Sequence, residues 1–266
     1  MNATPRDPAA DRRAWFFHGF RDHYLPGKLR KHFHAVRLAK GSAAVPATGP
    51  LVVAMNHPGW WDPLLACELS RRFPAGTEHF GAIDQDALAV YPFFHKLGVV
   101  GVDTKSVRGA AEFLRTGRRL LGDPRRALWV TAQGVFADVR RRPLGLRSGV
   151  GHLAAGLTAG FVLPVAFEYV FWDESKPEAL VRIGDPLPAG GGTGRTWTAR
   201  IEAALTTTLD ALSADAMSRD PGRFETLVGG RTGAGGVYDL FRRVKATATG
   251  RRFAAGHADA VRDERR

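Results

Sequence analysis

Short apolar runs alternate along the chain with segments of helical periodicity, and this alternation limits the folds that the chain can adopt. The apolar runs predict β-strands at residues 51–55, 78–83, 99–102, 127–131, 161–170 and 180–183. Elsewhere, apolar residues recur every three or four positions and predict helices at residues 62–72, 85–97, 107–121, 150–159 and 197–212. Strands that alternate with helices are typical of parallel sheets. We therefore expect an α/β fold, a layered sandwich with a mostly parallel central sheet flanked by helices.

The N-terminal part of the chain has the pattern of basic amphipathic helices. Aromatic and leucine residues recur at helical spacing between residues 16 and 33, and Lys and Arg residues lie among them. Pro26-Gly27 is expected to divide this region into two helical segments. Such helices suit the headgroup region of a membrane. An ordinary packing helix shows the same pattern, so both interpretations stay open.

The composition predicts one hydrophobic core with basic ends. At 266 residues and 44% hydrophobic content, the chain can bury one substantial core. We divide it into a basic amphipathic N-terminal segment (1–40), an α/β domain (41–215) and a basic C-terminal extension (216–266). The glycine-rich stretches 190–194 and 229–236 are expected to be loops, because neither contains the Gly-Lys-Ser/Thr of a phosphate-binding loop. A short amphipathic segment is expected at 237–243, and a charged tail from His257.

The charge of the chain predicts an anionic partner. The formal net charge is +12 and the isoelectric point about 10.6, which fits nucleic acid, an anionic membrane surface or a phosphorylated substrate. Cys67 is the single cysteine, so an intrachain disulfide is excluded and a reducing compartment is expected. The most apolar stretch, 161–172, is too short to span a bilayer. We therefore expect a cytoplasmic protein, peripheral to the inner face of the cell membrane.

A histidine and a carboxylate lie five positions apart directly after the strand at 51–55, in the sequence Asn56-His57-Pro58-Gly59-Trp60-Trp61-Asp62. An imidazole oriented by a carboxylate can take a proton from a hydroxyl as its oxygen attacks. Asn56 can fix the loop through side-chain hydrogen bonds to the backbone. In the structural alternative, Asp62 is only the N-cap of a helix with Pro63 at its first position, and His57 is a turn residue.

Around this motif the chain resembles the glycerophosphate acyltransferase-like superfamily, whose best-known members are bacterial 1-acylglycerol-3-phosphate acyltransferases. The resemblance covers roughly residues 35–190 and rests on blocks in the same order. These blocks are Asn56-His57-x-x-x-x-Asp62, the segment 93–103, Ala132-Gln133-Gly134-Val135-Phe136, Leu146-Arg147-Ser148-Gly149, Val162-Leu163-Pro164-Val165-Ala166 and Ile183-Gly184-Asp185-Pro186-Leu187.

The resemblance implies a lipid acyltransferase in phospholipid biosynthesis. His57 would be the general base that deprotonates the acceptor hydroxyl, and Asp62 would hold its ring. The donor would be acyl-CoA or acyl carrier protein, with no cofactor, no metal and no covalent enzyme intermediate. Backbone N–H groups near Gly134 are candidates to stabilise the oxyanion.

The third block departs from the family's Pro-Glu-Gly-Thr-Arg. Gln133 and Phe136 replace the glutamate and arginine that are associated with the acceptor's phosphate and headgroup, and Thr104 with Lys105 stands where a second-block arginine is expected. The basic residues that follow can compensate as phosphate ligands, or they can form a solvated loop. The candidate substrate-binding residues are therefore Asn56, Lys105, Gln133, Gly134, Arg140, Arg142 and Arg147, with Arg141 beside them.

Two acceptor classes follow from these observations. The resemblance predicts a lysophospholipid-type acceptor. The altered third block favours a glycolipid or carotenoid glycoside, because the amide of Gln133 can bind a neutral polyol.

Other functions have less support in the sequence. A thioesterase or esterase would use water in place of the acceptor, although the chain has no Gly-x-Ser-x-Gly sequence. A nucleic-acid-binding protein has only the basic charge in its favour, since no binding motif is present, and no nucleic-acid partner is expected. His32 and His34, with His18 and His23 upstream, lack the clustered carboxylates or thiolates of a metal site, so no metal is expected.

Overall fold

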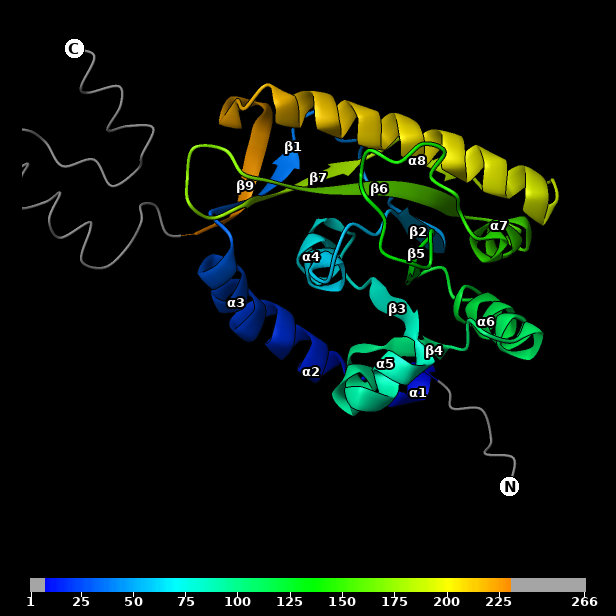
Figure 1. Ribbon diagram of the computed structural model, residues 1–266. Coiled ribbons are helices and arrows are strands. Elements are labelled where there is room, and N and C mark those ends of the chain that lie inside the picture. The colour runs from blue at the N-terminus through cyan, green and yellow to red at the C-terminus, as the bar shows by residue number, and fades with distance from the viewer. Residues whose placement is uncertain (1–7, 231–266) are drawn as a thin grey trace, which may run out of the picture.

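One mixed sheet runs through the centre of the molecule (Figure 1). A computed structural model describes residues 8–230 of the chain. The strand order is β4-β3-β5-β2-β6-β7-β1-β9, and β8 pairs with the start of β6. The strands are β1 (Ala35–Ala39), β2 (Leu51–Met55), β3 (Glu78–Asp84), β4 (Val99–Val102), β5 (Arg126–Thr131), β6 (Phe161–Val170), β7 (Glu178–Ile183), β8 (Leu187–Pro188) and β9 (Phe224–Gly229). Neighbouring strands from β4 to β6 are parallel, so the expected mostly parallel α/β sandwich is confirmed.

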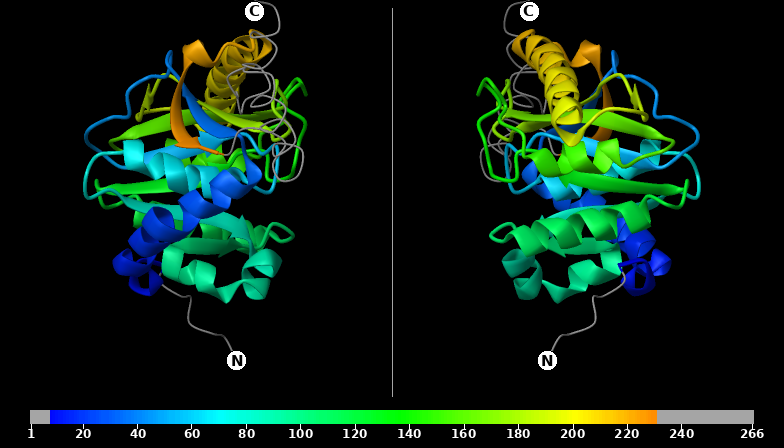
Figure 2. Two further views of the ribbon diagram at one scale, coloured as in Figure 1. Left: turned by 90° about the vertical axis from the view of Figure 1, so that its left-hand side faces the viewer. Right: turned by 90° about the vertical axis from the view of Figure 1, so that its right-hand side faces the viewer.

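Helices cover both faces of the sheet, as the two views of Figure 2 show. The α-helices are α1 (Pro8–Asp11), α2 (Ala14–Gly19), α3 (Leu25–His32), α4 (Asp62–Leu69), α5 (Gln85–Val90), α6 (Val107–Leu120), α7 (Ser148–Ala155) and α8 (Gly194–Met217). A π-helical turn (Phe20–Tyr24) joins α2 to α3, and 3-10 turns lie at Ser70–Arg72, Pro92–Leu97 and Pro221–Arg223. Residues of α6, α7 and α8 pack on one face of the sheet, and those of α3 and α4 pack on the other.

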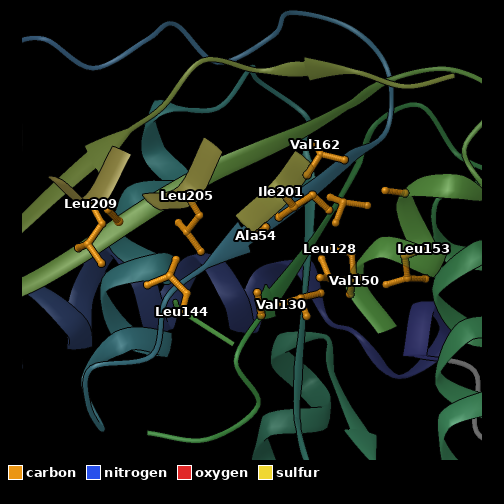
Figure 3. Packing of buried hydrophobic residues seen from close by; sticks show 14 of the residues in the cluster. Ala54, Leu128, Val130, Leu144, Val150, Leu153, Val162, Ile201, Leu205 and Leu209 are labelled. Atoms are coloured by element: carbon orange, nitrogen blue, oxygen red, sulfur yellow. The ribbon is translucent and has the colours of Figure 1, made fainter. Parts of the chain in front are cut away.

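The side chains of β2 alternate between the two core layers. Val52 and Ala54 point to the layer under α7 and α8, where Ile201 and Leu205 of α8 meet them (Figure 3). Leu51, Val53 and Met55 point to the layer under α3 and α4. All five β2 residues are buried. The carboxyl end of this central strand is therefore held from both faces, and it is a rigid base for the loop that follows.

The N-terminal region differs from the expectation in two ways. Pro26 does not break the helix, because it lies in the first turn of α3, where a missing N–H costs no helical hydrogen bond. Residues 35–39 are the strand β1, parallel to β7 and antiparallel to β9. The N-terminal segment 1–40 and the C-terminal extension 216–266 thus each contribute a strand, β1 and β9, to the sheet.

The apolar stripe of the N-terminal helices packs mainly against the protein itself. Leu25, Leu29 and Phe33 are fully buried in the core layer under α3 and α4. The packing interpretation therefore accounts for these three residues. Trp15 and Tyr24 point outward, with exposed fractions of 72% and 56%.

Several predicted element bounds shift for local reasons. The helix expected at 85–97 is interrupted before Pro92, and the helix expected at 62–72 ends in a 3-10 turn. The glycine-rich stretch 190–194 contains a turn that ends in a capping box between Thr193 and Thr196, which begins α8. No described helix has the length and apolarity needed to cross a bilayer. The segment expected at 237–243 and the tail from His257 lie outside the described residues.

Candidate active site

The loops that follow β2 and β5 meet the last residues of β6 at the carboxyl edge of the sheet. β2 pairs with β5 on one side and β6 on the other, and all three strands are parallel. In open α/β sheets this edge is where ligands bind. The motif from Asn56 to Asp62 forms the loop between β2 and α4.

His57 and Asp62 face each other within this loop. The imidazole Nδ1 lies 2.6 Å from Asp62 Oδ2, and the Asp62 side chain is fully buried. Trp61 is the N-cap of α4 and Asp62 is its first residue, without a side-chain capping bond. The structural alternative in which Asp62 is only an N-cap is therefore wrong. Its carboxylate turns back into the loop and also accepts the Gly59 backbone N–H at 3.1 Å.

This pairing leaves Nε2 of His57 as the basic nitrogen. A carboxylate on Nδ1 favours the tautomer in which Nδ1 carries the proton. Nε2 has no hydrogen-bond partner among residues 8–230, and 18% of the side chain is exposed. The imidazole can therefore accept a proton from a hydroxyl that approaches from solvent.

The backbone of His57 is clamped by the loop after β5. Its N–H donates to Gln133 Oε1 at 3.0 Å, and its carbonyl accepts the Ala137 N–H at 3.0 Å. Gln133 Nε2 donates to the Leu144 carbonyl at 3.0 Å, and Gln133 is buried. The predicted contact of Gln133 with a polyol acceptor conflicts with this geometry, because both polar atoms of its amide are occupied within the protein. Gln133 instead positions His57.

The same loop is attached to α8 (Figure 1). Arg142 forms an ion pair with Asp210, and the Gly145 N–H donates to Glu202 Oε1 at 2.9 Å. Leu144 is buried among the residues that α8 contributes to the core (Figure 3). The position of the His57 backbone therefore depends on α8 through this loop.

Asn56 fixes the start of the motif to β6. Its Nδ2 donates to the Phe167 carbonyl at 2.9 Å, and its Oδ1 accepts the Phe167 N–H at 2.8 Å. The expected side-chain to backbone hydrogen bonds are present. Since Asn56 is buried and both polar atoms of its amide bind the Phe167 backbone, it positions the loop, and the predicted substrate contact is not supported.

Tyr169 is a site residue that the sequence did not reveal. Its hydroxyl donates to Asp62 Oδ1, the carboxylate oxygen that does not contact His57. Burial, together with the negative charge of Asp62, raises the pKa of Tyr169, so the phenol stays protonated and acts as a donor. The one sequence signal is a tyrosine at the polar end of an otherwise apolar strand.

Gly134 forms a tight turn beside Arg147. Its φ of +66° is in the left-handed region, and a Cβ at this position would lie 2.7 Å from Arg147 Cδ. The Gly134 N–H donates to the Thr131 carbonyl at 3.0 Å, so this group is not an available oxyanion donor. The N–H groups of Val135 and Phe136 have no partner within residues 8–230.

Three of the five basic residues that were predicted to bind phosphate are paired with carboxylates. Lys105 Nζ lies 2.6 Å from Asp86 Oδ2, and Arg140 Nη2 lies 2.6 Å from Asp138 Oδ2. Arg142 pairs with Asp210. Arg141 and Arg147 are exposed and have no carboxylate partner in the part of the chain that the structure describes. Lys105 follows β4, which is separated from β2 by β3 and β5.

The ring of Phe136 packs against that of His57, and two neighbouring apolar residues are exposed. The Phe136 ring centroid is 4.4 Å from that of the imidazole, and Phe136 is 63% exposed. Val135 and Trp60 are also exposed. An apolar rim of this kind suits the acyl chain of a lipid.

The N-terminal histidines have partners in the protein. The His32 ring lies 4.9 Å from that of Trp61, and His34 Nε2 lies 3.7 Å from Glu178 Oε1. Within residues 8–230, no group of three or more His, Cys, Asp or Glu residues could hold a metal ion.

Comparison with known proteins agrees with this geometry. The family model described as acyltransferase matches residues 37–168, from β1 into β6. The match includes His57, Asp62, Gln133 and Arg147, and it ends one residue before Tyr169. No curated protein matches the chain.

Proposed function

Because residues 37–168 of the chain belong to the acyltransferase family, we propose that the protein transfers a fatty acyl group from acyl-CoA or acyl carrier protein to a hydroxyl of a lipid acceptor. The supporting observation is the contact of 2.6 Å between His57 Nδ1 and the fully buried carboxylate of Asp62. It leaves a basic nitrogen at the edge of the sheet where substrates bind.

The proposed reaction is a direct transfer without a covalent enzyme intermediate. Nε2 of His57 takes the proton of the acceptor hydroxyl as its oxygen attacks the thioester carbonyl carbon. Asp62 stabilises the imidazolium that forms. The C–S bond then breaks, and the leaving thiolate takes the proton from Nε2, so that the products are an ester and a thiol.

The oxyanion of the tetrahedral intermediate needs hydrogen-bond donors close to His57. The N–H groups of Val135 and Phe136 are suitable because they lack partners within residues 8–230 and because Phe136 contacts the imidazole. In this proposal they replace the N–H of Gly134, which is engaged in its own turn.

The charges around the site favour an uncharged acceptor over a lysophosphatidate. Lys105, Arg140 and Arg142 each have a carboxylate partner, so each pair has no net charge with which to attract a phosphate dianion. Phe136 covers the side of His57 where the sequence resemblance would place an arginine. A glycolipid-type acceptor therefore fits better than the lysophospholipid that the resemblance predicts. Arg141 and Arg147, which have no carboxylate partner within residues 8–230, are the residues that a phosphate would require.

A competition between acceptors tests this function. The purified protein is given radiolabelled acyl-CoA with equal concentrations of an alkyl glucoside and lysophosphatidate, and the lipid products are separated. We expect acylated glucoside to exceed phosphatidate by about tenfold, the ratio that 1.4 kcal/mol produces.

The other products have definite meanings. An excess of phosphatidate would show that the acceptor is a lysophospholipid, as the resemblance predicts. Free fatty acid without an acylated lipid would identify the thioesterase alternative, in which water replaces the acceptor. Thioester consumption that persists in a His57→Ala variant would contradict the proposed mechanism.

We also propose that the protein binds anionic membranes peripherally. This rests on the outward-facing Trp15 and Tyr24 and on the exposed Arg30 and Lys31 of the same helical region. Aromatic residues beside basic ones are typical of interfacial helices. Deletion of residues 1–40 is not a usable test, because it would remove β1 from the interior of the sheet.

Point substitutions test membrane binding without disturbing the sheet. A Trp15→Ser/Tyr24→Ser variant should bind liposomes that contain phosphatidylglycerol about tenfold more weakly in co-sedimentation, because it loses two aromatic groups from the interface. Met217→Ser is the matched control, since Met217 is 76% exposed on α8. Equal binding of wild type and the double variant would reject this surface.

A further inference from the structure

We propose that Tyr169 is a positioning residue of the proton-transfer site, which holds Asp62 in the orientation in which its carboxylate orders His57. The proposal rests on the proposed function for its kinetic part. Tyr169 does not need to touch either substrate, because its contact is with Asp62.

Asp62 has three different donors on its two oxygens. Oδ2 accepts Nδ1–H of His57 and the Gly59 N–H, and Oδ1 accepts the Tyr169 hydroxyl. The Asp62 side chain is fully buried, so water does not replace a missing donor without a rearrangement. Tyr169 is the one donor to Oδ1 in the described part of the chain, and it fixes the rotation of the carboxylate about its terminal bond.

The positions of Tyr169 and His57 both depend on the paired strands β2 and β6. Asn56 precedes His57 and clamps both backbone polar groups of Phe167, which lies two positions before Tyr169 on β6. Residues two apart on a strand point to the same face. The register of β2 against β6 therefore sets the position of the phenol relative to the imidazole.

The ring of Tyr169 is held from two further sides. It stacks on Phe33 at the end of α3, with ring centroids 5.9 Å apart and an interplanar angle of 23°. On the motif side, the ring lies against Gly59, where an added Cβ would meet Tyr169 Cε2 at 3.4 Å. These contacts leave the hydroxyl in a defined place, which is what a positioning hydrogen bond requires.

The hydroxyl matters most when His57 is protonated. As the imidazole takes the acceptor's proton, the carboxylate must face Nδ1. A carboxylate that lost its Oδ1 donor could rotate, and the base would then be misaligned in the transition state. The effect is expected in kcat and not in substrate binding.

The experiment uses Tyr169→Phe, which removes only the hydroxyl and keeps the ring that stacks on Phe33. We expect kcat for acyl transfer to fall about tenfold, since one hydrogen bond to a charged group is lost, and KM to stay within about twofold. Tyr91→Phe, at a tyrosine that is 48% exposed, is the matched control and should have unchanged kinetics.

A double variant separates positioning from general packing. If Tyr169 acts through Asp62, Tyr169→Phe should cause no further loss of kcat when it is added to an Asp62→Asn variant. An unchanged kcat in the single variant, or an equal additional loss when Asp62→Asn is already present, would overturn the proposal.

A spectroscopic readout does not depend on the proposed function. The Nδ1 proton of His57, assigned by its absence in His57→Ala, should change its NMR position in Tyr169→Phe and keep it in Tyr91→Phe. An unmoved resonance would reject the hydrogen-bond chain. If the protein has no acyl-transfer activity but the resonance still moves, the proposed function is wrong and the positioning role of Tyr169 is supported.

Discussion

Replacement of His57 by alanine is expected to reduce kcat for acyl transfer by about 10²- to 10⁴-fold, because a general base contributes a factor of this size. The corresponding increase in barrier is about 3 to 5 kcal/mol. KM should change little, since Nε2 acts on the hydroxyl as the bond forms. The measurement is thiol release from acyl-CoA in the presence and absence of an acceptor.

The fold should survive this substitution. The hydrogen bonds of residue 57 to Gln133 and Ala137 use backbone atoms, so alanine keeps them. Asp62 keeps the donors from Gly59 and Tyr169. His23→Ala is the matched control, because His23 is exposed on the π-helical turn. Normal turnover by a well-folded His57→Ala variant would end the case for this mechanism.

Three strands could be predicted from the sequence because most of their residues are hydrophobic. β2, β4 and β6 have the predicted bounds, and each is an apolar run flanked by turn residues. β1 and β9 could not be predicted in the same way. β1 carries Arg37, which is buried because its Nε donates to Glu178 Oε2 at 2.8 Å, and β9 exposes Glu225 and Thr226. The buried ion pair of β1 and the exposed polar residues of β9 interrupt the hydrophobic pattern by which a strand is predicted.

The contact between His57 and Asp62 could be predicted, but the residues that support it could not. His57 and Asp62 lie in one loop, so their spacing alone brings them together. Gln133 binds His57 across 76 positions of sequence, and Tyr169 binds Asp62 across 107. Only the order of the strands in the sheet brings these residues together. Charge pairing was hidden for the same reason, since Arg142 meets Asp210 across 68 positions.

Phosphate binding by the basic residues after the third block could not be decided from the sequence. The sequence supplies the cations but does not show which carboxylates lie beside them. The nucleic-acid alternative has the same weakness, because it rested on net charge alone. The match of residues 37–168 to the acyltransferase family model supports an acyltransferase in its place.

Asparagine at position 62 should reduce kcat by about 10³- to 10⁴-fold, although it has nearly the shape of aspartate. Loss of the charge in a histidine–aspartate pair costs up to about 10⁴-fold in a well-studied hydrolase, and here the imidazolium that forms would no longer be stabilised by a negative charge. The amide can direct its oxygen to His57 and Gly59 and its NH₂ to the Tyr169 oxygen, so the buried network stays satisfied. A loss of activity without a loss of thermal stability is therefore expected.

Two comparisons decide whether the carboxylate acts through the imidazole. Asp86→Asn, at an exposed carboxylate paired with Lys105, is the matched control and should keep full activity. The double variant His57→Ala/Asp62→Asn should be no slower than His57→Ala alone, because the charge of Asp62 has no function once the base is absent. If the two losses instead multiply, Asp62 must act on the substrate or the fold independently of His57, and the assignment of the pair as one catalytic unit would be wrong.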